Sequence, residues 1–244
     1  MIATLPRPVR PGRPEPLENG DCLTAAEFLR RYEAMPQLKK AELIEGIVYM
    51  GSPVRYRLHG RPDALVHLWL AYYEAHTPGV EFVANTTAQL DIENVPQPDN
   101  LLRIREACGG QSRVDEHDYL VGAPELVVEI AASGESIDLH AKLRAYRRNG
   151  VKEYLTWRTL EGHFDWRVSA EGDFRLLTPD ARGVYRSTVF PGLWLDVKAI
   201  GKGDTAGVLT CLDRGLGSGE HKAFVAKLAA ARGSTPRHPR GRKA

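Results

Sequence analysis

The segment APELVVEIAA, residues 123–132, constrains the fold of this 244-residue chain more than any other stretch. Its apolar and β-branched residues from Leu126 to Ile130 are typical of a strand that is covered on both faces, as in an α/β sheet. Glu129 interrupts that run. Burying an unpaired carboxylate is so costly that the group is normally neutralised, paired or bound to a metal. Glu129 therefore lies either at a strand end in water or in a functional site.

The patterns around this strand predict a single α/β domain with a mixed sheet. Residues 136–150 are expected to form a helix, with Ser136 or Asp138 near its start and Gly150 as its stop signal, and residues 151–159 resume as a strand. The other predicted elements are helices at 23–36, 61–79 and 220–232, a strand pair or one bulged strand at 40–53 around Gly46, strands at 80–94 and 95–104, and hairpins with a closing segment at 164–197.

Two local signals refine these elements. Thr24 and Glu27 have the spacing of a capping box, which predicts the start of the first helix. Pro96 and Pro98 lie in the strand predicted at 95–104. Because proline cannot donate a hydrogen bond to a neighbouring strand, they restrict this strand to a sheet edge or a bend.

Composition divides the chain into three parts. Residues 1–20, rich in proline, arginine and glycine, are expected to be a disordered basic arm, residues 21–200 the folded domain, and residues 201–244 an extension with a short helix and a basic tail. Hydrophobic residues make up 43% and charged residues 26% of the chain, as in ordinary globular proteins. The formal net charge is only +2, but basic ends are compatible with a polyanionic partner.

The cysteines and the hydropathy pattern bear on the compartment. Cys22, Cys108 and Cys211 are scattered and lack CxxC spacing, which argues against a disulfide framework or a zinc ribbon and favours a reducing compartment. The N-terminus has no apolar signal-peptide core, and no segment has the length of a membrane span. A cytoplasmic protein that does not enter the membrane is therefore expected.

Three residues could form a site if neighbouring strands bring them together. Asp99 follows a proline at a strand start, Glu129 lies near the end of the next long strand, and Lys142 lies on the following helix, one turn after Asp138. Two adjacent carboxylates repel each other unless a proton or a cation intervenes, and such oxygen ligands suit Mg²⁺ or Mn²⁺. A metal with a nearby lysine is suited to phosphodiester hydrolysis, although acid pairs on adjacent strands are common.

The order of these motifs resembles the Uma-two family, which is classed with restriction endonucleases in the PD-(D/E)xK nuclease-like superfamily. The resemblance runs from about residue 24 to residue 197. It is carried by AELIEGIVYMGSP, QPD and APELVVEIAASGESIDLHAKLRAYRRNGVKEYL, in that order. It implies a restriction-endonuclease-like core, with a central mixed β-sheet flanked by helices, in residues 21–200, and an endonuclease that hydrolyses DNA.

The resemblance also implies roles for individual residues. Asp99, in Pro98-Asp99, matches the PD motif, and Glu129 would be the second acid that shares a divalent metal, Mg²⁺ or Mn²⁺. The wider superfamily has a lysine two positions after that acid, where this chain has Ala131. Lys142 matches a lysine that has migrated to the following helix in this family.

Two further positions match the family pattern. Glu42 matches an acidic position ahead of the core strands, so it is expected to have an auxiliary role, with Glu45 as the competing acid. His59 matches a family position without a clear role.

Each of these residues also has an ordinary structural interpretation. Glu129 could be solvated or paired with Lys142 or Arg144, and Asp99 could be a turn residue in QPDN. Lys142 could be a solvated helix residue that pairs with Asp138.

Two rival functions follow. The first is a nucleic-acid-binding protein that kept the fold and lost cleavage, and the lysine missing at Ala131 favours it. The second is a protein-interaction module whose acids serve only in ion pairs. If the protein cuts both strands of DNA, a homodimer with two active sites is plausible.

Overall fold

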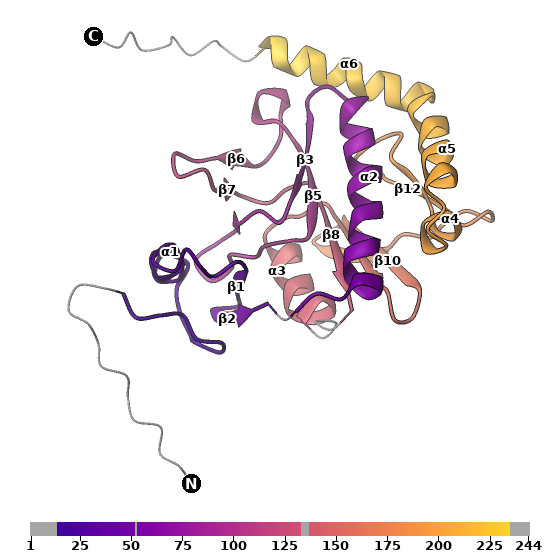
Figure 1. Ribbon diagram of the computed structural model, residues 1–244. Coiled ribbons are helices and arrows are strands. Elements are labelled where there is room, and N and C mark those ends of the chain that lie inside the picture. The colour runs from indigo at the N-terminus through magenta and orange to yellow at the C-terminus, as the bar shows by residue number, and fades with distance from the viewer. Residues whose placement is uncertain (1–13, 52, 133–136, 235–244) are drawn as a thin grey trace.

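A six-stranded mixed sheet forms the centre of the computed structural model, which describes residues 14–51, 53–132 and 137–234 (Figure 1). The strand order is β11-β10-β9-β8-β5-β3, in which β8 and β9 are parallel and all other neighbours are antiparallel. The strands are β3 (Val80–Ala84), β5 (Asn100–Ile104), β8 (Leu126–Ala131), β9 (Glu153–Arg158), β10 (His163–Ala170) and β11 (Asp173–Leu176).

The parallel pair β8–β9 is joined by a helical crossover, as a parallel connection requires. The crossover consists of the π-helical turn η3 (Ile137–Ala141) and helix α3 (Lys142–Arg148). Gly150, with a φ of 83°, ends it as predicted, because glycine adopts this left-handed conformation without steric cost. Ser136, the alternative start of this helix, lies outside the described residues.

The two faces of β8 pack against different helices. Leu126, Val128 and Ile130 belong to the main core cluster under helix α2 (Arg61–Ala75). Val127 belongs to a smaller cluster with Tyr146 of α3. Since successive side chains of a strand alternate between its faces, Glu129 lies on the α3 face together with Val127.

The C-terminal helices close the outer side of α2. They are α4 (Val197–Gly201), α5 (Thr205–Leu216) and α6 (Gly219–Ser234). Val208 and Leu212 of α5 and Phe224 and Leu228 of α6 are buried in the main core. The extension predicted to hold one short helix therefore contains two full helices that complete the core.

An N-terminal layer packs beside the sheet (Figure 1). It contains α1 (Ala25–Glu33), the hairpin of β1 (Ala41–Ile44) and β2 (Ile47–Met50), and the π-helical turn η1 (Tyr56–Gly60). Thr24 caps α1 by accepting a hydrogen bond from the Glu27 amide, as the capping box predicts. Mutual backbone hydrogen bonds between Leu43 and Val95 tie the hairpin to the segment that leads into β5.

The smaller elements lie at the periphery. They are β4 (Ala88–Gln89), β6 (Arg113–Val114) and β7 (Leu120–Val121) in one sheet, β12 (Val184–Arg186) and β13 (Trp194–Asp196) in another, and the 3-10 turn η2 (Glu106–Cys108).

Two further expectations differ from the structure. Leu17, placed in the disordered arm from composition, is 3% exposed and packs with the hairpin, so ordered structure begins before residue 20. The strand predicted to lie at a sheet edge or a bend is β5, which is an interior strand between β3 and β8. Pro96 and Pro98 do not prevent this, because they precede its first residue and remove no hydrogen bond from it. The basic tail, with Arg237, lies outside the described residues, and within them no helix combines the length and apolarity needed to cross a membrane.

Candidate active site

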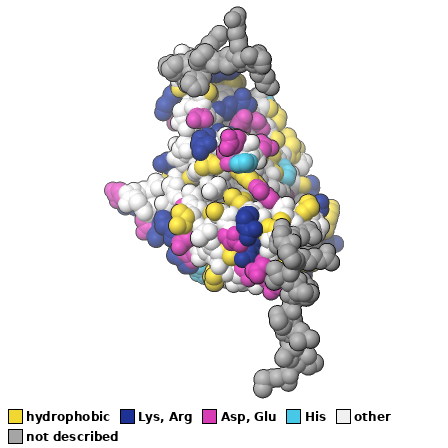
Figure 2. Space-filling model, turned by 90° about the vertical axis from the view of Figure 1, so that its left-hand side faces the viewer, with side chains coloured by type: hydrophobic (Ala, Val, Ile, Leu, Met, Phe, Trp, Pro, Cys, Tyr) yellow, Lys and Arg dark blue, Asp and Glu magenta, His cyan; other side chains and the backbone are white. Residues whose placement is uncertain are grey.

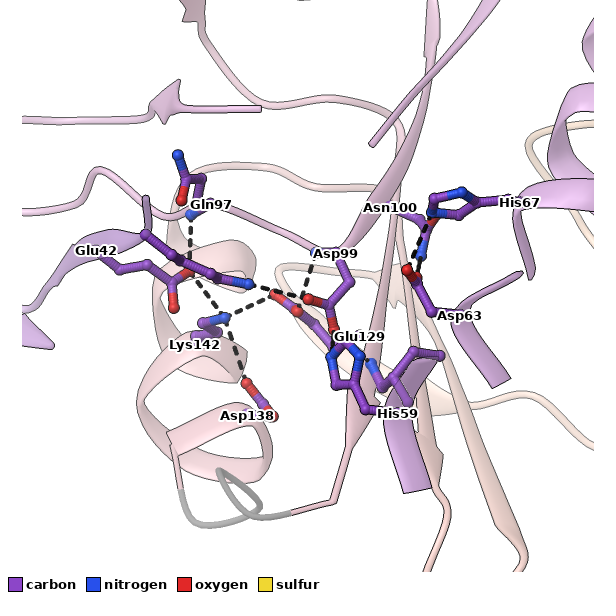
Figure 3. Close-up of polar contacts among 12 residues, drawn as sticks. Glu42, His59, Asp63, His67, Gln97, Asp99, Asn100, Glu129, Asp138 and Lys142 are labelled. Atoms are coloured by element: carbon purple, nitrogen blue, oxygen red, sulfur yellow. Dashed lines mark hydrogen bonds and ion pairs between the residues drawn. The ribbon is translucent and has the colours of Figure 1, made fainter. Parts of the chain in front are cut away.

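Asp99 and Glu129 lie side by side on neighbouring strands (Figure 3). Because Asn100 of β5 is opposite Val128 of β8 in an antiparallel register, Asp99, the residue before Asn100, meets Glu129, the residue after Val128. The Asp99 amide donates to Glu129 Oε2 at 3.3 Å, and the Ile130 amide donates to Asp99 Oδ2 at 2.9 Å. Asp99 is 4% and Glu129 1% exposed, so the pair is buried.

Lys142 supplies the central positive charge. Its Nζ lies 2.9 Å from Glu42 Oε1, 2.9 Å from Glu129 Oε1 and 3.4 Å from Asp138 Oδ1. Lys142 is the first residue of α3, and Asp138 precedes it by one turn, so the crossover helix places both over β8. The hairpin brings in Glu42, which also accepts a hydrogen bond of 2.7 Å from the Gln97 amide.

Asp99 has two cationic neighbours of its own. Lys40 Nζ donates to Asp99 Oδ1 at 3.0 Å, and His59 Nε2 lies 3.2 Å from Asp99 Oδ2. The Lys40 side chain is 31% and the His59 side chain 21% exposed, whereas Lys142 is almost completely buried. The structure thereby gives His59 a partner that the sequence could not identify.

The two carboxylates have opposite pKa shifts. Burial raises the pKa of Glu129 to about 8, although the nearby Lys142 opposes the shift. Burial also acts on Asp99, but the hydrogen bond from His59 and the charge of Lys40 hold the pKa of that carboxyl well below its usual range. Without a bound cation the site therefore favours one ionised acid and one that retains a proton.

The lysines and the histidine respond to the same charges. Burial lowers the pKa of Lys142, but the carboxylates of Glu129 and Glu42 outweigh it and raise that pKa well above the usual value. The hydrogen bond to Asp99 raises the pKa of His59. The cluster of acids thus holds its lysines charged and favours the protonated imidazole.

The donor set fits a hard divalent cation. Each carboxylate oxygen can accept about two hydrogen bonds, and Asp99 Oδ1 and Glu129 Oε2 each have one partner in the described structure. Four acids, Glu42, Asp99, Glu129 and Asp138, surround two lysines, and a cation held by Asp99 and Glu129 would displace the proton that Glu129 otherwise retains. In the described ranges no three His, Cys, Asp or Glu side chains lie close enough to hold a metal ion together, so a cation held by the two acids would keep several waters, as Mg²⁺ does.

A cavity of about 600 Å³ gives access to these groups. It is lined by Lys40, Glu42, His59, Asp99, Glu129 and Lys142 among other residues. Figure 2 shows that basic and acidic side chains are interspersed over the visible face of the described residues. The described residues on this face therefore form no large patch of one sign.

The four predicted site residues meet in this cavity. Asp99, Glu129, Lys142 and Glu42 are in one connected network, whereas Glu45 pairs with Arg144 outside it. The sequence reasoning missed Lys40, and it missed Tyr146, whose hydroxyl donates to Glu129 Oε1 at 2.9 Å. Lys40 has no local signal, since it is 59 residues from Asp99 in the sequence, whereas Tyr146 lies one helical turn after Lys142 on α3.

Comparison with known proteins identifies the family of this chain. The family Uma2, described as "Putative restriction endonuclease", matches residues 25–198. The chain belongs to the Uma2 family. This result confirms the resemblance seen in the motif order, and the match covers every residue of the network from Lys40 to Tyr146.

A solved structure shares the fold of this Uma2 chain. It is titled "Crystal structure of a putative nuclease belonging to DUF820 from Anabaena variabilis ATCC 29413 at 1.96 A resolution". The TM-score is 0.55 at 13% sequence identity, over 74% of this chain and 98% of that one. The similarity confirms the predicted α/β fold with a central mixed sheet. No curated protein matches the chain.

Proposed function

We propose that this protein is a metal-dependent endonuclease that hydrolyses phosphodiester bonds in DNA. The observation that carries the proposal is the acid pair of Asp99 and Glu129, buried on neighbouring strands and lining one cavity with two lysines. Membership of a family described as restriction endonucleases supports the same chemistry.

The residues of the site have distinct tasks in this proposal. A bound Mg²⁺ or Mn²⁺, held by Asp99 and Glu129, would polarise the phosphate and lower the pKa of a water molecule. Lys40 and His59 keep Asp99 ionised, so that it is ready to bind a cation. Water loses a proton as it attacks phosphorus, and the bond from phosphorus to the leaving sugar oxygen breaks as that oxygen takes up a proton, so the net change is one proton moved from water to the leaving oxygen.

The two lysines differ in what they can reach. Lys142 is enclosed by Glu42, Glu129 and Asp138, where it limits their mutual repulsion and fixes the position of Glu129. Its assistance at the scissile phosphate, which the family pattern implies, requires it to leave one of these partners. Lys40 is partly exposed and lines the cavity, so it can contact a phosphate while it remains near Asp99.

The test is cleavage of supercoiled plasmid and of single-stranded DNA by the purified protein with Mg²⁺ or Mn²⁺. Nicking or linearisation is expected for the wild type, and Asp99→Ala and Glu129→Ala should each abolish it. Glu45→Ala is the matched control, because Glu45 is a nearby acid that pairs with Arg144 outside the network. Activity that survives both alanine substitutions contradicts the assigned site, and absence of cleavage with every metal contradicts the proposed function.

A second function has one observation in its favour. The superfamily lysine position holds Ala131, and Lys142 is engaged by three carboxylates, which fits a protein that binds metal and DNA without cutting. Calorimetric titration with Mg²⁺ separates the cases. Binding that depends on Asp99, without cleavage, supports the degenerate nuclease, whereas no binding supports a module without metal chemistry.

A further inference from the structure

The rim of the cavity exposes apolar side chains. Val54, Tyr56 and Leu160 are 72%, 77% and 63% exposed, among the most exposed large hydrophobic residues of the described chain. Val54 and Leu160 line the cavity. The Thr159 hydroxyl donates to the Leu58 carbonyl at 2.7 Å, so the two segments of the rim are held together. Exposed apolar groups next to a functional cavity indicate a binding surface.

The same rim carries positive charge without compensation. Arg55 and Arg57 flank Tyr56 in the sequence, and residues 53–61 contain no acid. Both arginines are exposed, Arg55 lines the cavity, and neither forms an ion pair with any residue that the structure describes. Arg103, Arg144 and Arg186, by contrast, each pair with a carboxylate. Two exposed, unpaired guanidinium groups beside an aromatic ring are suited to a polyanion with flat apolar faces.

We propose that this rim, composed of Val54, Arg55, Tyr56, Arg57 and Leu160, binds a single-stranded stretch of nucleic acid and leads it to the acid pair. The inference rests on the proposed function and specifies its substrate class. Arg55 and Arg57 contact phosphates, while Tyr56 and the aliphatic side chains contact bases. Only unpaired bases can make these contacts, because in a duplex the base faces are stacked inside the helix.

The charge of the rim argues against a second copy of this chain as its occupant. In a two-fold interface the same patch faces itself, so Arg55 and Arg57 would be brought close to their own copies. Like charges facing each other across an interface are unfavourable. A nucleic-acid strand instead complements both the charge and the apolar surface, and the rim is continuous with the cavity that contains Asp99 and Glu129.

The test measures binding without cleavage. One labelled oligodeoxynucleotide, used as a single strand and as a duplex with its complement, is titrated with protein in Ca²⁺, and fluorescence anisotropy gives both affinities. The wild type is expected to bind the single strand more tightly. Tyr56→Ala should weaken single-strand binding about ten-fold, since stacking on an aromatic ring contributes about 1–3 kcal/mol per base, and should leave duplex binding unchanged.

Salt dependence tests the arginines. The double variant Arg55→Gln, Arg57→Gln should lower the slope of log K against log salt by roughly 0.7 per lost phosphate contact on a single strand. The matched control is Arg182→Gln with Arg214→Gln, two exposed arginines outside the rim, and Leu176→Ala controls for loss of an exposed apolar side chain. The controls should bind like the wild type.

Three results overturn the inference: no binding of either form, equal affinity for single strand and duplex that Tyr56→Ala does not change, or a wild-type dimer that Tyr56→Ala dissociates. The proposed nuclease function can be contradicted independently of this inference. A protein that binds single strands through Tyr56 but cuts nothing retains this inference and loses the nuclease assignment. A protein that cuts DNA but binds single strands equally well with and without the Tyr56 side chain retains the nuclease assignment and loses this inference.

Discussion

At the scale of single residues, Lys142 is the position where a substitution should affect stability most within the site. It is 3% exposed and contacts the carboxylates of Glu42, Glu129 and Asp138. Removing one partner of a buried ion pair leaves uncompensated charge and costs about 3–5 kcal/mol. We therefore expect Lys142→Met to lower the free energy of unfolding by that amount in urea titrations with EDTA present.

Lys40→Met is the matched control for this prediction. Lys40 makes one ion pair and its side chain is 31% exposed, so solvent screens its loss and a smaller change is expected. If the two variants lose the same free energy, or if Lys142→Met is as stable as the wild type, Lys142 is not the counter-ion that holds the acids together.

Residues of the site differ in how far the sequence could predict them. Asp99 and Glu129 were predictable because strand patterns and motif order placed both acids on neighbouring strands. The contact of Lys40 depends on how the hairpin packs against the sheet, which no local pattern encodes. Tyr146 lies one helical turn after Lys142 and shares its face, but its contact depends on how α3 lies over β8, which carries Glu129. For such residues, only the tertiary structure identifies the partner.

At the scale of elements, His221 joins α6 to the end of α2. Its Nδ1 lies 3.0 Å from the Leu216 carbonyl oxygen, and its Nε2 lies 3.0 Å from Thr77 Oγ1. A neutral imidazole can donate from Nδ1 to the Leu216 carbonyl and accept at Nε2 from the Thr77 hydroxyl, whose single proton is otherwise donated to the Tyr73 carbonyl. Burial lowers the pKa of His221, and the charge of the facing His76 acts in the same direction.

The lowered pKa of His221 gives a pH dependence with a definite sign. The unfolded chain, with a histidine pKa of about 6.5, binds the proton more readily than the folded chain, so stability falls as the pH drops through that value. Thermal unfolding of the wild type and of His221→Gln should therefore show a stability difference that narrows from pH 8 to pH 5.5. His117→Gln, at an exposed histidine, controls for loss of an imidazole. A difference that stays constant or widens contradicts the neutral, buried form.

Helices and strands with strong local sequence signals could be predicted, and those with weak signals could not. The unit of β8, α3 and β9 and the hairpin around Gly46 were predictable from apolar runs and stop signals. Helix α5 was missed because residues 201–219 are rich in glycine, which disfavours helices. The structure explains Gly215: a Cβ there would lie 2.2 Å from the Gly192 carbonyl oxygen, so the glycine allows close packing. A residue that weakens the helix signal thus serves a contact that only the fold reveals.

At the scale of the whole molecule, the site joins parts of the chain that are far apart in sequence. Glu42 comes from the hairpin, Asp99 from the segment entering β5, Glu129 from β8 and Asp138 from the crossover (Figure 3). The acids are brought together only in the folded state. A divalent cation that binds them should therefore bind the folded chain and not the unfolded one, and it should stabilise the whole molecule.

This coupling can be measured as a shift in the thermal unfolding midpoint. At a Mg²⁺ concentration of 100 times the dissociation constant, the gain is about 2.7 kcal/mol, and each kcal/mol raises the midpoint of a chain of this size by roughly 2–4 °C. K⁺ at equal ionic strength should have little effect, because it lacks the charge density that the two acids favour. Asp99→Asn should remove most of the shift, whereas Glu45→Gln, outside the network, should retain it. A shift of equal size in the wild type and in Asp99→Asn would mean that Mg²⁺ binds elsewhere, and the acid pair would then have to be explained by its lysines alone.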